Sequence, residues 1–385
     1  MKRTRNRYVG AAFLIVIGVL AAAQLTLQDA ANAQARQTVQ APMFQVDPMW
    51  PKPLPNNWVF GNIIGISIDS RDHVWITHRG STTQPKEAGM AQTPPLSSLC
   101  CNIAPPIVEF DPDGNVVSSW GGPGAGYEWP DSMHGLTVDY KDNVWLGGNG
   151  KTDNQVLKFT RQGKFLLQIG HKGASKGNTD TVNVRQAAEV EVDPKTNEVF
   201  VADGYGNRRV IVFDADTGAY KRHWGAYGKM PDDAPNETYD PKGTPSQMFR
   251  TVHCVQLAND GLTYVCDRIN DRIQVFRRDG TYVKEGWIQR DTLGDGVTFD
   301  MAFSKDAQQR YLYVADGANH RIWVLLRDPL QILTHFANGG RMPGQFYAVH
   351  NLAVDSKGNI FTCETYEGKR VQKFVYKGIG AVSAN

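Results

Sequence analysis

The sequence predicts an all-β fold: a six-bladed β-propeller with four antiparallel strands per blade and a ring closed by an N-terminal strand. Similar units recur at intervals of roughly 46 to 70 residues, a period typical of propellers and solenoids. Within each unit, short runs alternate apolar with polar residues and end at Gly, Asn or Asp, as strands joined by turns do. The 38 Gly and 20 Pro supply many turns. No amphipathic helical pattern interrupts the units.

The first 35 residues have the pattern of a secretory signal. A basic head is followed by the apolar run Val9–Leu20, and small residues at Ala31-Asn32-Ala33 and Ala33-Gln34-Ala35 have the spacing that signal peptidases require. We expect residues 1–35 to be a signal peptide, so that the mature protein is periplasmic or secreted and has no membrane segment. The alternative is an uncleaved anchor, because the apolar stretch nearly reaches spanning length.

The propeller is expected over residues 57–378, followed by a tail at 379–385. Residues 36–56 form a Pro-rich extension in which Met43–Val46 has the pattern of a strand. The sixth unit contains only three strands, so we expect Met43–Val46 to supply the fourth and leave no exposed sheet edge. The insertion 79–106 in the first unit is rich in Ser, Thr, Pro and Gly and is expected to be a loop, either covering the channel mouth or disordered.

Two further patterns concern charges and cysteines. An acid followed five or six residues later by Arg recurs in four units, which indicates buried ion pairs linking blades; the pairs are Asp203/Arg209, Asp267/Arg272, Asp316/Arg321 and Glu364/Arg370. Cys254 and Cys266 flank the turn at Asn259-Asp260-Gly261. They either face each other across one hairpin or are small buried side chains.

Three histidines recur at one position of the repeat. The residues that open the first strands of the six units are, in order, Ile64, His134, Ala188, His253, Phe299 and His350. The first strand of each blade lines the central channel, so histidines in alternate blades should approach the axis with threefold symmetry. Three neutral imidazoles with an open fourth position favour catalytic Zn²⁺. The sequence therefore predicts a metal site in the channel, held by His134, His253 and His350.

The charge balance excludes some partners. The chain has 41 Lys and Arg against 39 Asp and Glu, a formal charge of +2. It therefore has no electrostatic reason to bind nucleic acid or an anionic membrane, and we expect a small-molecule or peptide substrate.

Between about Asn57 and Tyr376, the chain resembles NHL-repeat propellers and, among them, the peptidyl-α-hydroxyglycine α-amidating lyase domain of peptidylglycine alpha-amidating monooxygenases. The resemblance rests on an ordered set of motifs: Thr77-His78-Arg79-Gly80, Met133-His134-Gly135-Leu136, Val201-Ala202-Asp203-Gly204-Tyr205, Val252-His253, Asp267-Arg268-Ile269-Asn270-Asp271-Arg272-Ile273-Gln274 and Val349-His350.

The resemblance implies a lyase that splits a carbinolamide into a primary amide and glyoxylate. It implies zinc on the three histidines, Tyr205 as the base, and Arg79 and Arg268 as arginines of the substrate pocket. The chemistry is coherent. A metal acidifies a nearby hydroxyl, a guanidinium clamps a carboxylate, and a tyrosine acts as a base only beside positive charge.

The chain departs from that family at several positions. Ala348 stands where the family has methionine, and Asn351 where it has an aspartate associated with a structural calcium; Asn can still ligate Ca²⁺ through its oxygen. The family's disulfide positions fall at residues such as Gly206 and Tyr264. The chain contains no counterpart of the copper monooxygenase domain, so we expect nothing in it to make the hydroxyglycine substrate. Two other functions stay open: a metal-dependent hydrolase of a lactone or ester, and a non-catalytic NHL binding module.

Overall fold

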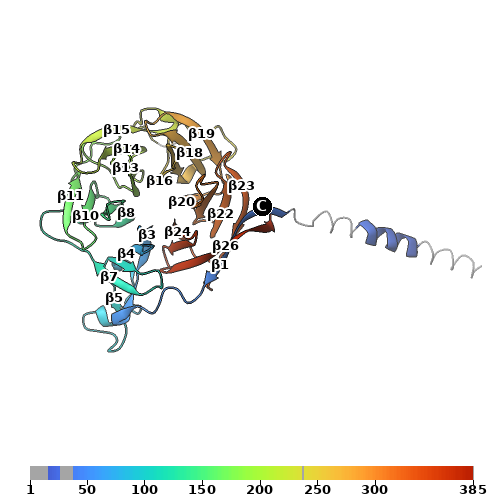
Figure 1. The fold of residues 1–385 in the computed structure, drawn as a ribbon, viewed down its shortest axis with the longest axis horizontal. Helices are drawn as coiled ribbons and strands as arrows, with labels where there is room; N and C mark the ends of the chain where they lie inside the picture. The colour runs from blue at the N-terminus through green and yellow to red at the C-terminus, as the bar shows by residue number, and fades with distance from the viewer. Residues whose placement is uncertain (1–15, 27–37, 236–237, 385) are drawn as a thin grey trace, which may run out of the picture.

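The computed structural model describes residues 16–26, 38–235 and 238–384, and it is a six-bladed β-propeller (Figure 1). Six sheets of four antiparallel strands surround a central channel. This confirms the predicted fold class. Of the expected signal peptide, residues 1–15 and 27–35 lie outside the described residues, and residues 16–26 are helical. Among the described residues, no helix is long and apolar enough to cross a membrane.

Each blade is an antiparallel sheet whose first strand lies nearest the axis. The first three blades consist of β3 (Asn62–Ile68), β4 (Val74–Arg79), β6 (Ile107–Phe110) and β7 (Val116–Trp120); β8 (Met133–Val138), β9 (Val144–Gly148), β10 (Val156–Phe159) and β11 (Phe165–Ile169); and β12 (Glu189–Asp193), β13 (Glu198–Asp203), β14 (Arg209–Asp214) and β15 (Tyr220–Trp224). The last three consist of β16 (Val252–Leu257), β17 (Leu262–Asp267), β18 (Arg272–Arg277) and β19 (Tyr282–Trp287); β20 (Thr298–Phe303), β21 (Tyr311–Asp316), β22 (Arg321–Leu326) and β23 (Gln331–Phe336); and β24 (Val349–Val354), β25 (Ile360–Glu364), β26 (Val371–Ser383) and β1 (Thr38–Asp47).

The ring is closed by the two outermost strands of the sixth blade. β1 pairs antiparallel with β26 from Thr38↔Ser383 to Asp47↔Lys373. The N-terminal closing strand is thus confirmed, and it is longer than the predicted Met43–Val46. The expected tail at 379–385 is wrong over residues 379–383, which belong to β26. They are drawn into the sheet because β1 presents backbone donors and acceptors along its whole length.

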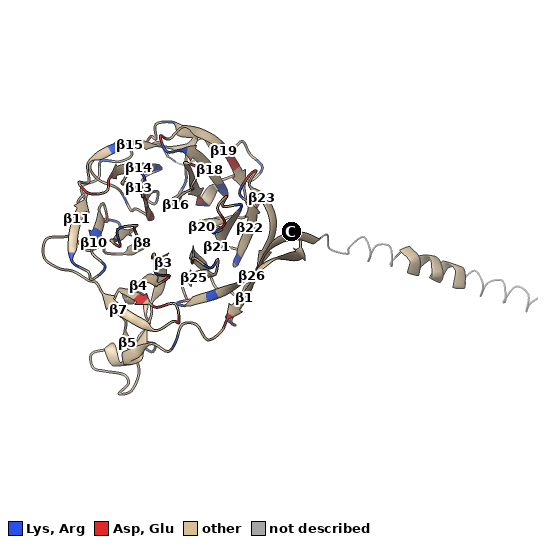
Figure 2. Cartoon of the chain, viewed as in Figure 1, with Lys and Arg blue, Asp and Glu red and all other residues tan. Residues whose placement is uncertain are grey.

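The hydrophobic core is divided among the six blade interfaces. Each of six buried clusters joins side chains of two neighbouring sheets. Trp75, for example, packs from the first blade against Leu136 and Leu146 of the second. Both faces of the strands near the axis are covered, as in β8 and β9, where every residue is buried. Charged residues of both signs are distributed around the ring (Figure 2).

The insertion in the first blade is folded rather than disordered. It contains the short helices η2 (Gly80–Thr82) and η3 (Gly89–Ala91), and its strand β5 (Asn102–Ile103) pairs with β2 (Trp58–Val59), which precedes the blade. Lys369 ties it to the sixth blade, since its Nζ donates to the Thr82 carbonyl at 3.0 Å and to Glu87 at 2.5 Å.

Three of the four expected acid–arginine pairs form, but each joins residues within one blade, whereas pairs between blades were expected. Asp203 and Arg209 are register partners within one blade, 2.8 Å apart, and Arg209 also donates to the carbonyls of Asn178, Asp180 and Asn183 in the incoming connection. The pair therefore fastens that connection to a hairpin of its own blade. Asp267–Arg272 and Glu364–Arg370 form at 2.7 and 2.6 Å.

The fourth expected pair, Asp316 and Arg321, does not form a salt bridge. Asp316 accepts from Asn319 and from the indole of Trp323, while Arg321 lies over the Trp323 ring. Aromatic and amide partners thus replace the salt bridge.

Cys254 and Cys266 form a disulfide across the β16–β17 hairpin, with their Cα atoms 4.9 Å apart. Of the two alternatives for these cysteines, the structure therefore shows the pairing across one hairpin.

Candidate metal centre

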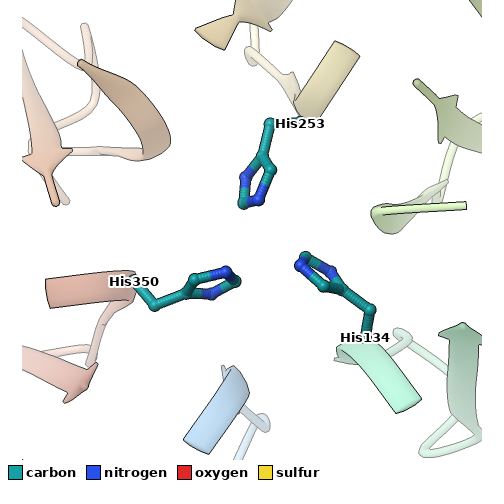
Figure 3. Close-up of side chains that lie close together, drawn as sticks. All are labelled: His134, His253 and His350. Carbon is teal, nitrogen blue, oxygen red and sulfur yellow. The ribbon is translucent and has the colours of Figure 1, made fainter. Parts of the chain in front are cut away.

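The three histidines at the aligned position converge on the channel axis. The side chain of His134 points to the axis from β8, that of His253 from β16 and that of His350 from β24 (Figure 3). Their ring centroids lie 4.8 to 5.0 Å apart, which makes a nearly equilateral triangle. All three are buried, and one ring nitrogen of each lies within 4.8 Å of those of the other two. Figure 3 shows the imidazoles pointing toward one another.

Local irregularities in the inner strands aim these side chains inward. The pairing register of β16 shifts between Val252 and Cys254, and that of β24 between Val349 and Asn351. In β8 the shift falls between His134 and Leu136. A β-bulge adds one residue to a strand and redirects its side chain. Each histidine therefore sits at or beside a bulge, which turns it toward the axis.

Every Nδ1 of the three rings has an acceptor that leaves the opposite nitrogen free for the axis. His134 Nδ1 lies 2.7 Å from the Ala188 carbonyl oxygen, His253 Nδ1 bonds the Phe299 carbonyl, and His350 Nδ1 bonds the side-chain oxygen of Asn351. Carbonyl oxygens only accept, so each Nδ1 carries the proton in the neutral ring and each Nε2 keeps its lone pair. Metal-bound histidines are held in this way.

Burial keeps the three imidazoles neutral. It lowers the pKa of His350 to about 3, with further lowering by the charges of Arg268 and Arg79. Burial is also the main cause of the pKa of His134 and of His253 lying well below the usual value. A neutral ring is the form that ligates a metal, so the cluster is in its ligand form at neutral pH.

Tyr205 and Arg268 complete the site. The Tyr205 hydroxyl lies 3.0 Å from Nε2 of both His134 and His253. Arg268 donates from Nη1 to that hydroxyl at 3.0 Å, and its guanidinium lies over the rings of Tyr205 and Phe299, 5.3 and 4.7 Å from their centroids. Arg268 is only 7% exposed, and its Nε has no hydrogen-bond partner among the described residues. It therefore keeps donor capacity for an anion.

Arg79 is brought near the site without touching the histidines. It comes from the end of β4 and donates from Nε to the Met133 carbonyl at 2.9 Å and from Nη2 to Asn149 at 2.8 Å. Its charge contributes to lowering the pKa of His134. Asn149 is a residue that sequence reasoning missed; it positions Arg79 and also accepts from Ser132 at 2.8 Å.

The two departures from the family pattern near His350 can now be placed. Ala348 is buried, has a left-handed backbone with φ of 53°, and its N–H donates to His320 at 3.0 Å. Asn351, expected as a possible Ca²⁺ ligand, directs its side-chain oxygen at His350. The roles of the Ala188 and Phe299 carbonyls were missed because they depend on how neighbouring blades pack. The role of Asn351 was missed because it depends on the orientation of its side chain.

Two other clusters in the described residues carry metal-ligating groups, and both are already engaged. Asp69, His73 and Glu109 surround the guanidinium of Arg161, which pairs with both carboxylates. In the cluster of Glu189, Cys254 and Asp300, the sulfur belongs to the disulfide. The histidine cluster offers three nitrogen lone pairs toward one point, and this donor set fits Zn²⁺.

Fold and site together define a six-bladed β-propeller with a histidine cluster on its axis. No family model matches the chain. It is 28% identical over 327 residues to peptidyl-glycine alpha-amidating monooxygenase B of Xenopus laevis, covering 80% of this chain and 33% of that protein. It therefore spans about a third of the length of that relative.

Shorter relatives are covered over more of their length. The identity is 27% to peptidyl-alpha-hydroxyglycine alpha-amidating lyase 1 of Drosophila melanogaster, over 86% of this chain and 59% of that one. It is 25% to NHL repeat-containing protein 3 of Mus musculus, over 88% and 85%. The solved structure of a streptogramin B lyase shares the fold, with a TM-score of 0.51, 13% identity and coverage of 87% and 98%. The homologues of this chain are thus amidating lyase domains and NHL repeat-containing proteins.

Proposed function

We propose that this protein is an exported, zinc-dependent lyase that cleaves a peptidyl-α-hydroxyglycine-like carbinolamide into a primary amide and glyoxylate. The observation that carries the proposal is the convergence of three neutral imidazoles with a tyrosine hydroxyl and a buried arginine. Tyr205 lies 3.0 Å from two of the ligating nitrogens and from Arg268. The amidating lyases among the homologues support the reaction class.

His134, His253 and His350 would hold the zinc through their Nε2 atoms. Zinc bound there supplies a Lewis acid that lowers the pKa of a hydroxyl beside it. The remaining chemistry belongs to the side chains around the cluster.

Tyr205 acts as the base on the substrate hydroxyl. Its oxygen, as the phenolate, accepts the hydroxyl proton, and the O–H electrons form the aldehyde C=O of glyoxylate. The C–N bond breaks, and its electron pair takes the proton from Tyr205, which yields the primary amide and restores the phenolate. No water and no oxidant enter, so atoms and electrons balance. The N–H of Arg268 directed at the Tyr205 oxygen stabilises the phenolate by a charge-assisted hydrogen bond.

The arginines also bind the substrate. Glyoxylate carries a carboxylate, so the substrate presents one next to the reacting carbon. The Nε of Arg268 is buried at the site and has no partner among the described residues, and Arg79 brings a second positive charge to the same region. A guanidinium binds a carboxylate through two parallel hydrogen bonds, which would orient the hydroxyl toward Tyr205.

Export is proposed from the signal-like first 35 residues. The Cys254–Cys266 disulfide supports it, because disulfides persist in oxidising compartments. Finding the protein with its first 35 residues intact in the cytoplasm of its own host would contradict export.

The function is tested by separating metal binding from turnover. Purified wild type is assayed for bound zinc and for glyoxylate release from an α-hydroxyglycine peptide, beside His253→Ala, Tyr205→Phe and the exposed control His171→Ala. His253→Ala should lose metal and activity. Tyr205→Phe should keep metal and lose about 10²- to 10⁴-fold in turnover, the usual contribution of a general base. His171→Ala should match wild type.

Other outcomes favour the competing functions. Hydrolysis of esters or lactones that persists in Tyr205→Phe would indicate a metal-dependent hydrolase. A wild-type protein that binds no zinc and releases no glyoxylate would indicate a binding module, the function that the similarity to an NHL repeat-containing protein leaves open.

A further inference from the structure

The three histidines are not held in the same way. For His134 and His253, the acceptor of Nδ1 is the carbonyl of the aligned residue in the next blade, Ala188 and Phe299. By the same symmetry, His350 would bond the carbonyl of Ile64. It bonds the side-chain oxygen of Asn351 instead. One of the three prospective ligands thus depends on a side chain for its orientation.

A side-chain amide can orient the histidine ring only if a further contact fixes the amide itself. A backbone carbonyl is fixed by the sheet, whereas an amide can turn over and present N–H in place of oxygen. Turned over, Asn351 would set its N–H₂ against the Nδ1–H of His350, and the ring would have to expose its other tautomer to the axis. Something must therefore fix the amide.

Asp300 provides that anchor from the neighbouring blade. Its Oδ2 accepts from Asn351 Nδ2 at 3.1 Å and from the Leu352 N–H at 3.0 Å, and its Oδ1 accepts from the Met301 N–H at 2.7 Å. Asp300, His350 and Asn351 are each at most 3% exposed. All three partners are N–H donors, so Asp300 accepts at both oxygens and holds the N–H₂ of Asn351 toward itself and the oxygen toward His350.

The third blade contains a near-copy of this acid without the connection to a histidine. Glu189 follows Ala188 as Asp300 follows Phe299, and its carboxylate accepts from the Val255 N–H and from Gln256, both at 2.9 Å. Both acids therefore cap a backbone N–H of the next inner strand. His253 uses a backbone carbonyl, so Glu189 orients no ligand directly. Its carboxylate lies within 4.8 Å of that of Asp300, so the two acids are not independent of each other.

We propose that Asp300 and Asn351 are positioning residues that orient His350 and fix its tautomer, and that they thereby set the affinity of the histidine cluster for zinc. This inference rests on the proposed function of that cluster. Two backbone N–H groups orient Asp300, Asp300 orients the amide of Asn351, and the amide keeps the proton on Nδ1 of His350. Changing the outer partners of metal-bound histidines typically lowers metal affinity about 10- to 100-fold.

The test measures the zinc affinity of the full-length protein by competition with a chromophoric chelator. Asn351→Leu removes the acceptor, and Asp300→Asn removes the anchor that prevents the amide from turning. Each should weaken zinc binding about 10- to 100-fold. The control is Asp355→Asn. This buried acid lies just past the far end of β24 and accepts from the N–H and the side chain of Asn359 at 2.8 and 2.7 Å, so its change should leave zinc affinity within about threefold of wild type.

The double variant Asn351→Asp with Asp300→Asn exchanges the two groups. Residue 351 can then only accept, from His350 and from the new amide at 300. The Leu352 N–H loses its acceptor in this exchange, so zinc affinity should recover part of what Asp300→Asn loses. Thermal unfolding of the metal-free proteins, recorded in parallel, separates positioning from plain destabilisation, because Asp300→Asn and Asp355→Asn should both lose stability while only the first loses affinity.

Two results would overturn the inference while leaving the lyase in place. One is wild-type zinc affinity in both Asn351→Leu and Asp300→Asn alongside normal turnover. The other is an equal loss of affinity in Asp355→Asn, which would make the effect a general consequence of removing a buried carboxylate. If Asn351→Leu does not fold, Asp300→Asn and the double variant decide alone. A wild-type protein that binds no zinc would overturn both the inference and the proposed function.

Discussion

Replacing Arg209 by methionine should remove a large share of the stability of the third blade. Arg209 and Asp203 are both fully buried, and the guanidinium makes four hydrogen bonds: one to Asp203 at 2.8 Å and three to the carbonyls of Asn178, Asp180 and Asn183 at 2.6 to 2.9 Å. At about 1.5 to 3 kcal/mol for each bond to a charged group, their sum is an upper bound of about 6 to 12 kcal/mol.

The net loss should be smaller, because methionine removes the desolvation of the guanidinium. Breaking a buried ion pair from one side typically costs about 3 to 5 kcal/mol, and we expect a loss in that range. Asp203 keeps its bonds from the Arg185 N–H and Asn207, which limits the damage. Burial already raises the pKa of Asp203 despite the neighbouring Arg209, so loss of that arginine should raise it further.

The assay is urea unfolding at pH 7 followed by far-UV circular dichroism. The control is Lys284→Met, which breaks the exposed pair with Asp328 and should cost about 0 to 1 kcal/mol. Adding Asp203→Asn to Arg209→Met should recover part of the loss, since no carboxylate is then left unpaired. A loss for Arg209→Met no greater than that of the control would refute the reasoning.

Two further predictions concern the metal centre and the dependence of stability on pH. A Cβ at Gly135, whose φ is +68°, would collide with the Ala188 carbonyl that orients His134, so Gly135→Ala should weaken zinc binding about 10- to 100-fold. The control Gly173→Ala has a similar φ of +67° but open space around it, and its zinc affinity should stay at the wild-type value. Equal affinities of the two variants in a chelator competition would contradict the collision. Burial raises the pKa of Asp271 to about 8, above its unfolded-state value, so the folded state binds the proton more tightly. That contribution to stability is complete below about pH 4 and is lost at about 1.4 kcal/mol per pH unit as the pH rises toward 8. The urea midpoint of Asp271→Asn should therefore rise relative to that of wild type between pH 5 and pH 8. A difference between the two midpoints that stays constant over this range would contradict the raised pKa.

The sequence predicted the ring and the inward histidines because both follow from periodicity. Recurring short strands specify six blades, and one register position, repeated in alternate blades, places three imidazoles on the axis. The missing fourth strand of the last blade pointed to the N-terminal segment, which is where β1 was found. These inferences need only the spacing of residue types along the chain.

What the sequence did not predict depends on strand register and on packing contacts within and between blades. The bulges at His253 and His350 arise from register shifts of a single residue, which no hydrophobic pattern records. The groups that orient His134 and His253 are backbone carbonyls, which every residue has, so residue types cannot reveal them. Asp316 and Arg321 have the spacing of the other ion pairs, yet Trp323 provides a competing donor to Asp316. Spacing reveals which residues share a position, and packing decides what each one meets there.

The closure of the ring by β1 and β26 has a consequence for how the protein folds. Their register joins Thr38 to Ser383, so five whole blades lie between the two partners along the chain. Pairings between such distant segments raise the contact order and slow folding. Until β26 pairs with it, β1 presents an unpaired strand edge, which is a template for pairing with another chain. Ring closure therefore also ends the period in which the protein is most exposed to aggregation.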